Sequence, residues 1–147
     1  MPTKIFVNLP VRDIAKSTEF FGKLGFAPNL QYTDETSACV AVSRNIYVML
    51  LTEAKFRSLT PKVVCDATRN TEVLVSLSCD NRQEVDELVR KAVAAGGTAC
   101  LQPPEQGIRY EHGFQDLDGH IWELTCLDGV GSPGSEDPGM ASLLRLP

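Results

Sequence analysis

Glu123 is the residue in this sequence best placed for chemistry, because it is a lone carboxylate in an otherwise apolar strand pattern. It follows a hairpin signal at Asp118-Gly119, where Gly can take the positive φ that a tight turn requires and Asp tolerates it. Side chains alternate along a strand, so Glu123 and Trp122 point to opposite faces. We predict that Trp122 packs in a core and that Glu123 faces a cavity. A solvated Glu123 is the plainer alternative.

Few other residues of the chain could act beside this carboxylate. Tyr110 and His112 lie just before the hairpin and could reach the same cavity from a neighbouring strand, and Glu72 could reach it from another. The second histidine, His120, follows the tight turn, where we expect it to form hydrogen bonds within the turn. A catalytic metal needs about three protein ligands and an open position. The sequence offers that number only if several of these side chains converge.

The elements that would position these residues form two similar halves. Each half begins with a strand, at 4–13 and at 71–80, that runs directly into an amphipathic helix. Asp13 and Asn81 are suited to cap the two helices, with Glu84 at capping-box spacing from Asn81. Strand-like runs follow each helix, so each half is predicted as strand, helix and about three more strands; the clearest runs are 38–42, 46–51, 98–101 and 121–126. Gly25 and Gly96 are placed to end the two helices.

This order of elements and motifs resembles the vicinal oxygen chelate superfamily, which includes glyoxalase I, bleomycin-resistance proteins and extradiol dioxygenases. The motifs that carry the resemblance are Val11-Arg-Asp13, Ser17-Thr-Glu-Phe-Phe21, Leu24-Gly-Phe26 and the segment 116–124. The resemblance implies an α+β fold in which two βαβββ modules form a half-open curved barrel. It also implies a ligand site inside the concavity and, commonly, a homodimer.

In enzymes similar to these, a divalent metal is held by residues from the first and last strand of each module. Aligning Val11-Arg-Asp13 with the strand-to-helix junction of the superfamily places these positions at Phe6, at Val48 or Met49, at Leu74 and at Glu123. Only Glu123 has a side chain that binds such ions. We therefore expect no cofactor, with a divalent metal held through Glu123 as the alternative.

Length and composition indicate the domain organisation, the expected partners and the cellular compartment. The 147 residues suit one domain at 1–127, with module one at about 3–52, a linker at 53–70 and module two at about 71–127; a Gly/Pro-rich tail covers 128–147. The linker is a candidate lip for the pocket. With 14 basic and 19 acidic residues the net charge is −5, so neither nucleic acid nor an anionic membrane is an expected partner. Five cysteines without a Cys-x-x-Cys pair, and no signal peptide or membrane span, favour a cytoplasmic protein.

Two functions are compatible with these observations. The preferred one is a small-molecule-binding protein of the glyoxalase/bleomycin-resistance type without a complete metal site. Its expected ligand-binding residues are Phe6, Asn8, Met49, Glu72, Leu74, Ser76, Tyr110 and His112. The alternative is a metal-dependent lyase or dioxygenase resembling glyoxalase I, with Glu123 as a metal ligand or as a base.

Overall fold

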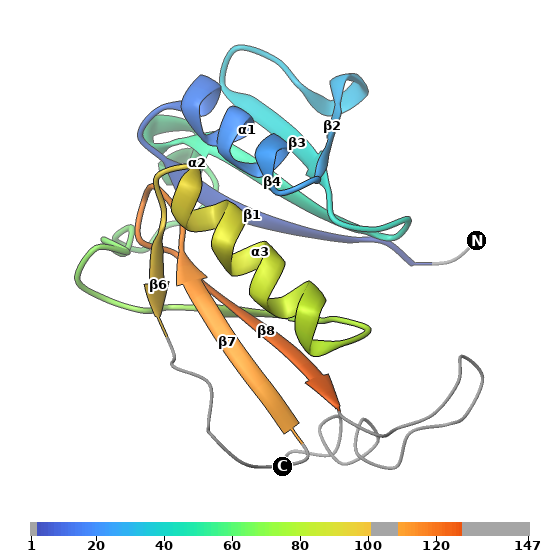
Figure 1. Ribbon diagram of the computed structural model, residues 1–147. Coiled ribbons are helices and arrows are strands. Elements are labelled where there is room, and N and C mark those ends of the chain that lie inside the picture. Colours follow the sequence, from blue (N-terminus) through green and yellow to red (C-terminus); the bar gives the residue numbers. More distant parts are fainter. Residues whose placement is uncertain (1–2, 101–108, 128–147) are drawn as a thin grey trace.

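Two four-stranded sheets, each with one long helix, build the computed structural model, which describes residues 3–100 and 109–127 (Figure 1). Module one runs from the first strand through its helix to three further strands and a 3-10 turn: β1 (Ile5–Val11), α1 (Ile14–Lys23), β2 (Ala27–Asn29), η1 (Leu30–Tyr32), β3 (Ser37–Ala41) and β4 (Ile46–Thr52). The short helix α2 (Glu53–Ser58) follows at the start of the linker.

Module two repeats the order of module one. Its elements are β5 (Leu74–Ser78), α3 (Arg82–Ala94), β6 (Thr98–Cys100), β7 (Arg109–Gln115) and β8 (Ile121–Leu127). The sheet orders are β1-β4-β3-β2 and β5-β8-β7-β6, with β1 parallel to β4 and β5 parallel to β8. Both sheets remain open rather than closing into one barrel. The predicted α+β fold of two βαβββ modules is confirmed.

The helix boundaries follow from their capping residues. The Asp13 side chain accepts a hydrogen bond from the Lys16 N–H at 3.0 Å, and the Asn81 side chain accepts one from Glu84 at 2.8 Å. The Glu84 carboxylate accepts from the backbone N–H of Asp80 at 2.7 Å, one residue before the position expected for a capping box. Gly25 and Gly96 follow the two helices with φ of 98° and 107°, as the sequence predicts.

One aromatic core joins the two modules. Trp122 of β8 is fully buried, and its ring lies 5.1 Å from that of Phe21 and 6.0 Å from that of Phe26, both in module one. Phe114 of β7 stacks on Trp122 from its own sheet, with centroids 6.1 Å apart. The helices α1 and α3 also contact each other. The prediction that Trp122 packs in the core is confirmed.

Each sheet packs one face against this core and leaves the other, here called its open face, away from its helix. In β5 the side chains of Val75 and Leu77 face the core, while Leu74 and Ser76 are exposed. This alternation puts the functional candidates of each strand on one side. None of the helices in the described ranges is long and apolar enough to cross a membrane. The predicted C-terminal tail lies outside the described residues.

Candidate functional site

The turn between β7 and β8 is held by a buried carboxylate. Asp116 accepts hydrogen bonds from the backbone N–H groups of Asp118 and His120, both at 3.0 Å, and from the indole N–H of Trp122 at 3.1 Å. Burial raises the pKa of Asp116, and the nearby His120 and these N–H donors oppose that shift. Three donors on one carboxylate fix the conformation of the turn and the orientation of the Trp122 ring.

This turn is also bonded to the junction between β1 and α1, and we call the connection the inter-module latch. Asp118 accepts from the Arg12 backbone N–H at 2.9 Å, from Arg12 Nε at 3.2 Å and from the Ser17 hydroxyl at 3.3 Å. His120 Nε2 lies 2.8 Å from the backbone oxygen of Pro10. Two of the motifs that carry the family resemblance, 11–13 and 116–124, thus meet in space and connect the modules.

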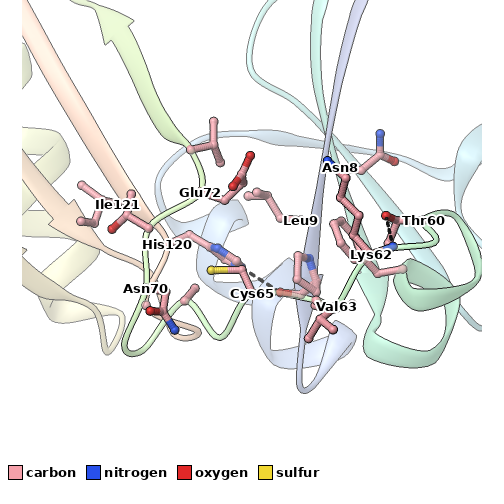
Figure 2. A pocket seen from close by; sticks show the side chains of 17 residues that line it. Asn8, Leu9, Thr60, Lys62, Val63, Cys65, Asn70, Glu72, His120 and Ile121 are labelled. Carbon is pink, nitrogen blue, oxygen red and sulfur yellow. Dashed lines mark hydrogen bonds between the residues drawn. The ribbon is translucent and has the colours of Figure 1, made fainter.

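Beside the latch lies a cavity of about 330 Å³, here called the inter-module cavity (Figure 2). Its walls come from β1, from the linker and from the residues that precede β5 and β8; the polar groups among them include Asn8, Lys62, Cys65, Asn70, Glu72 and His120. Apolar surface is supplied by Phe56, Val73 and Ile121. A concave site with apolar walls and a few polar groups is the usual form of a small-molecule pocket.

Glu123 lies on the open face of the second sheet, opposite in direction to Trp122. The Ser76 hydroxyl donates to its carboxylate at 2.6 Å, and Ser76 is its register partner on β5. The next strand places Gly113 opposite Glu123, and β6 places Cys100 opposite Gly113. Burial raises the pKa of the Cys100 thiol, and the negative charge of Glu123 raises it further. Glu123 is partly buried, so it is neither in bulk water nor enclosed.

The open face of the first sheet carries an aromatic cluster instead of a carboxylate. The rings of Phe6 and Tyr47 are stacked with centroids 5.0 Å apart, and Tyr32 meets Phe6 edge-on at 5.8 Å. Phe6 is 40% exposed and Tyr32 is 43% exposed. Asn8 is two residues further along β1 on the same face, so this cluster adjoins the inter-module cavity.

The structure brings most of the predicted site residues to these surfaces. Phe6, Asn8 and Met49 are on the first open face, and Leu74, Ser76 and Glu123 are on the second. Of the eight residues expected to bind a ligand, Asn8 and Glu72 line the inter-module cavity.

Tyr110 and His112 do not line the inter-module cavity, contrary to the expectation from the sequence. Their register partners on β8 are Cys126 and Leu124, whose side chains are buried in the core, so both residues lie on the helix side of the sheet. The Tyr110 hydroxyl donates to Asp86 of α3 at 2.6 Å. Because side chains alternate along β7, Glu111 and Gly113 lie on the open face in place of Tyr110 and His112.

The residues at the four expected metal positions do not fit a divalent cation. Val48 is buried, so the module-one position falls to Met49 on the open face, and Phe6 and Leu74 offer no donor. Glu123 is then the single suitable ligand, and it already accepts from Ser76. Over residues 3–100 and 109–127, no group of three His, Cys, Asp or Glu side chains is arranged to hold a metal.

The sequence argument missed the linker residues Lys62 and Cys65 and the position of His120 in the cavity wall. Nothing in the periodicity of the linker marks Lys62, because the segment 59–73 has neither helix nor strand. His120 was predictable as a turn residue, and its bond to Pro10 could be found only from the packing of one module on the other.

Comparison with known proteins agrees with this architecture. Residues 3–43 match the family model described as bleomycin resistance protein-like N-terminal. The hypothetical protein SA1046 from S. aureus is similar over 86% of this chain and 94% of its own, with 29% identity and a TM-score of 0.72. A glyoxalase-related enzyme from Fulvimarina pelagi is similar over 92% of this chain and 96% of its own, with 21% identity and a TM-score of 0.71. No curated protein matches the sequence.

A third similar structure is a glyoxalase/bleomycin resistance protein/dioxygenase family enzyme from Burkholderia phytofirmans. It covers 83% of this chain and 96% of its own, with 18% identity and a TM-score of 0.69. At such identities these two enzymes show a shared fold and leave the activity open. The resemblance found in the sequence motifs is confirmed at the level of the fold.

Proposed function

Because this chain has the fold of the vicinal oxygen chelate superfamily, we propose that it binds a small organic molecule without using a resident metal. The observation that carries the proposal is the inter-module cavity, which is walled by both modules and adjoins the exposed ring of Phe6, itself stacked on the half-buried Tyr47. The exposed rings of Phe6 and Tyr32 favour a ligand with a planar part. The polar groups of the cavity would then orient the rest of the molecule.

A second copy of the chain is part of this proposal. Each open face exposes a large apolar side chain: Phe6 by 40% on the first sheet and Leu74 by 52% on the second. Both sheets also end in unpaired edge strands within the described residues. A symmetric homodimer would cover these surfaces and would close the ligand site from the other side. Light scattering that gives only the mass of one chain over a wide concentration range would contradict it.

The alternative, a metal-dependent lyase or dioxygenase, needs ligands that Phe6, Met49 and Leu74 cannot supply. Glu123 could still act as a base toward a bound ligand, and turnover of that ligand would then make the protein an enzyme. No contact in the described structure favours this second function over binding.

The test is a thermal-shift screen with planar aromatic compounds, beginning with indole and 2-naphthol, followed by calorimetry of any that bind. A ligand of the native state must raise the melting temperature. Asn8→Trp should abolish the shift, because the larger side chain fills the cavity wall and Asn8 is exposed. Gln83→Trp, at an exposed position of α3, is the matched control and should leave the shift unchanged. Equal shifts in both variants would refute the proposed site.

A further inference from the structure

The module-two wall of the inter-module cavity offers hydrogen-bond acceptors. Glu72 is an exposed carboxylate without a charged partner among residues 3–100 and 109–127. His120 is only 8% exposed, and its Nε2 lies 2.8 Å from the Pro10 carbonyl oxygen. A carbonyl oxygen can only accept, so Nε2 carries a hydrogen, and in the neutral ring Nδ1 then has a lone pair. This Nδ1 has no hydrogen-bond partner in the described part of the chain.

The opposite wall offers donors. Lys62, on the linker, forms no ion pair with any carboxylate of the described residues, including Glu72. Asn8 of β1 uses one amide hydrogen on the Phe6 carbonyl oxygen at 3.3 Å, and its side-chain NH₂ group has a second. Figure 2 shows Glu72 and His120 on one side of the gap and Asn8 and Lys62 on the other. The cavity therefore has a negative, accepting wall and a positive, donating wall.

We propose that the inter-module cavity binds a small zwitterion of the amino-acid type with an apolar side chain. Its ammonium group would bind Glu72 and His120 Nδ1, its carboxylate would bind Lys62 and Asn8, and its apolar part would lie against Ile121, Val73 and Phe56. A zwitterion satisfies both unpaired charges at once, whereas an amine or an acid alone leaves one of them without a partner. This inference rests on the proposed function, since it specifies the ligand of the same cavity.

The experiment compares three probes that share one aromatic body: phenylalanine, phenethylamine and 3-phenylpropanoate. Calorimetry on the full chain should show phenylalanine binding about tenfold more tightly than either truncated probe, because a hydrogen bond to a charged group is then gained. Glu72→Gln should weaken phenylalanine and phenethylamine by about tenfold and leave 3-phenylpropanoate unchanged. Lys62→Met should weaken phenylalanine and 3-phenylpropanoate and leave phenethylamine unchanged. Both residues are exposed, so the variants should fold.

Matched controls are Glu19→Gln and Lys23→Met, which alter an exposed ion pair of α1 at 3.3 Å and line no part of the cavity. Neither should change any of the three affinities. Phenylalanine binding no more tightly than the truncated probes, or insensitive to Glu72→Gln, would overturn the inference. Indole binding that Asn8→Trp abolishes, without phenylalanine binding, would refute the zwitterion and leave the proposed function standing. Binding of none of these compounds would refute both.

Discussion

Replacing Asp118 by Ala should destabilise the protein mainly by leaving one buried and one partly buried donor of module one without an acceptor. Asp118 accepts from the Arg12 backbone N–H at 2.9 Å and from the hydroxyl of Ser17, which is 2% exposed. It also meets the Arg12 guanidinium at 3.2 Å, but that side chain is 71% exposed. Asp118 thus contributes to the inter-module latch one solvated ion pair and two hydrogen bonds to donors that are partly or fully buried.

The expected magnitudes of these two parts differ. An exposed ion pair contributes about 0.5 kcal/mol. A buried donor left unsatisfied costs about 1–3 kcal/mol, so losing both should cost about 3 kcal/mol. Arg12 and Asp118 also line a neighbouring hollow on the surface, and water entering from it would bring the loss toward the lower end. Against a total stability of about 5–15 kcal/mol, this is a large effect for a single turn residue.

Urea denaturation of Asp118→Ala and Arg12→Ala separates the two parts. Arg12→Ala keeps the backbone N–H that bonds to Asp118 and removes only the guanidinium, including its 2.8 Å bond to the Leu117 oxygen. We expect a loss of about 3 kcal/mol for the first variant and about 1 kcal/mol or less for the second. Equal losses would show that the exposed ion pair holds the modules together and that the argument from buried donors is wrong.

Three further changes should have measurable outcomes. Burial raises the pKa of Cys79 to about 12, so its thiol stays protonated at pH 8 and iodoacetamide should label Cys65 first. Labelling of Cys79 should increase as the pH rises toward 12. Fast labelling of Cys79 at pH 8, detected by peptide mapping, would contradict this. Trp122→Phe removes the 3.1 Å hydrogen bond to Asp116 and part of the buried indole, and should lower the free energy of unfolding by about 2 kcal/mol. An unchanged denaturation midpoint would show that neither the hydrogen bond nor the lost ring volume contributes to stability. Elemental analysis of protein purified without chelators should find less than one tightly held divalent ion per chain, and a stoichiometric metal that Glu123→Ala removes would establish the enzyme alternative.

Local sequence signals were sufficient for most of the fold. Asp13 and Asn81 determine where the helices begin because a short side-chain oxygen meets an N–H group three residues later, and this depends on nearby residues alone. The alternation around Trp122 was equally readable, because the single carboxylate of Glu123 among apolar neighbours indicates the open face and so assigns Trp122 to the buried one.

The site was harder to predict, because it depends on contacts between distant segments. Tyr110 and His112 were expected to reach the cavity, but they lie on the helix side of β7, and the residues around them in the sequence do not reveal which side the helix covers. Lys62 belongs to a segment without periodicity, so its place in the cavity follows only from the path of the linker. His120 could be assigned a role in the turn, but its partner is the Pro10 carbonyl, 110 residues away in the sequence.

The aromatic core and the latch join segments far apart in the sequence, so module one cannot complete its packing until β7 and β8 have been synthesised. Phe21 and Phe26 leave the ribosome about a hundred residues before Trp122, and the Arg12–Asp118 bond spans a sequence separation of 106 residues. At about 5–20 residues per second, the first module waits roughly 5–20 s for the hairpin that covers its aromatic side chains. During that interval the nascent chain exposes the kind of apolar surface that chaperones recognise. The two repeats are therefore copies in topology but not independent folding units.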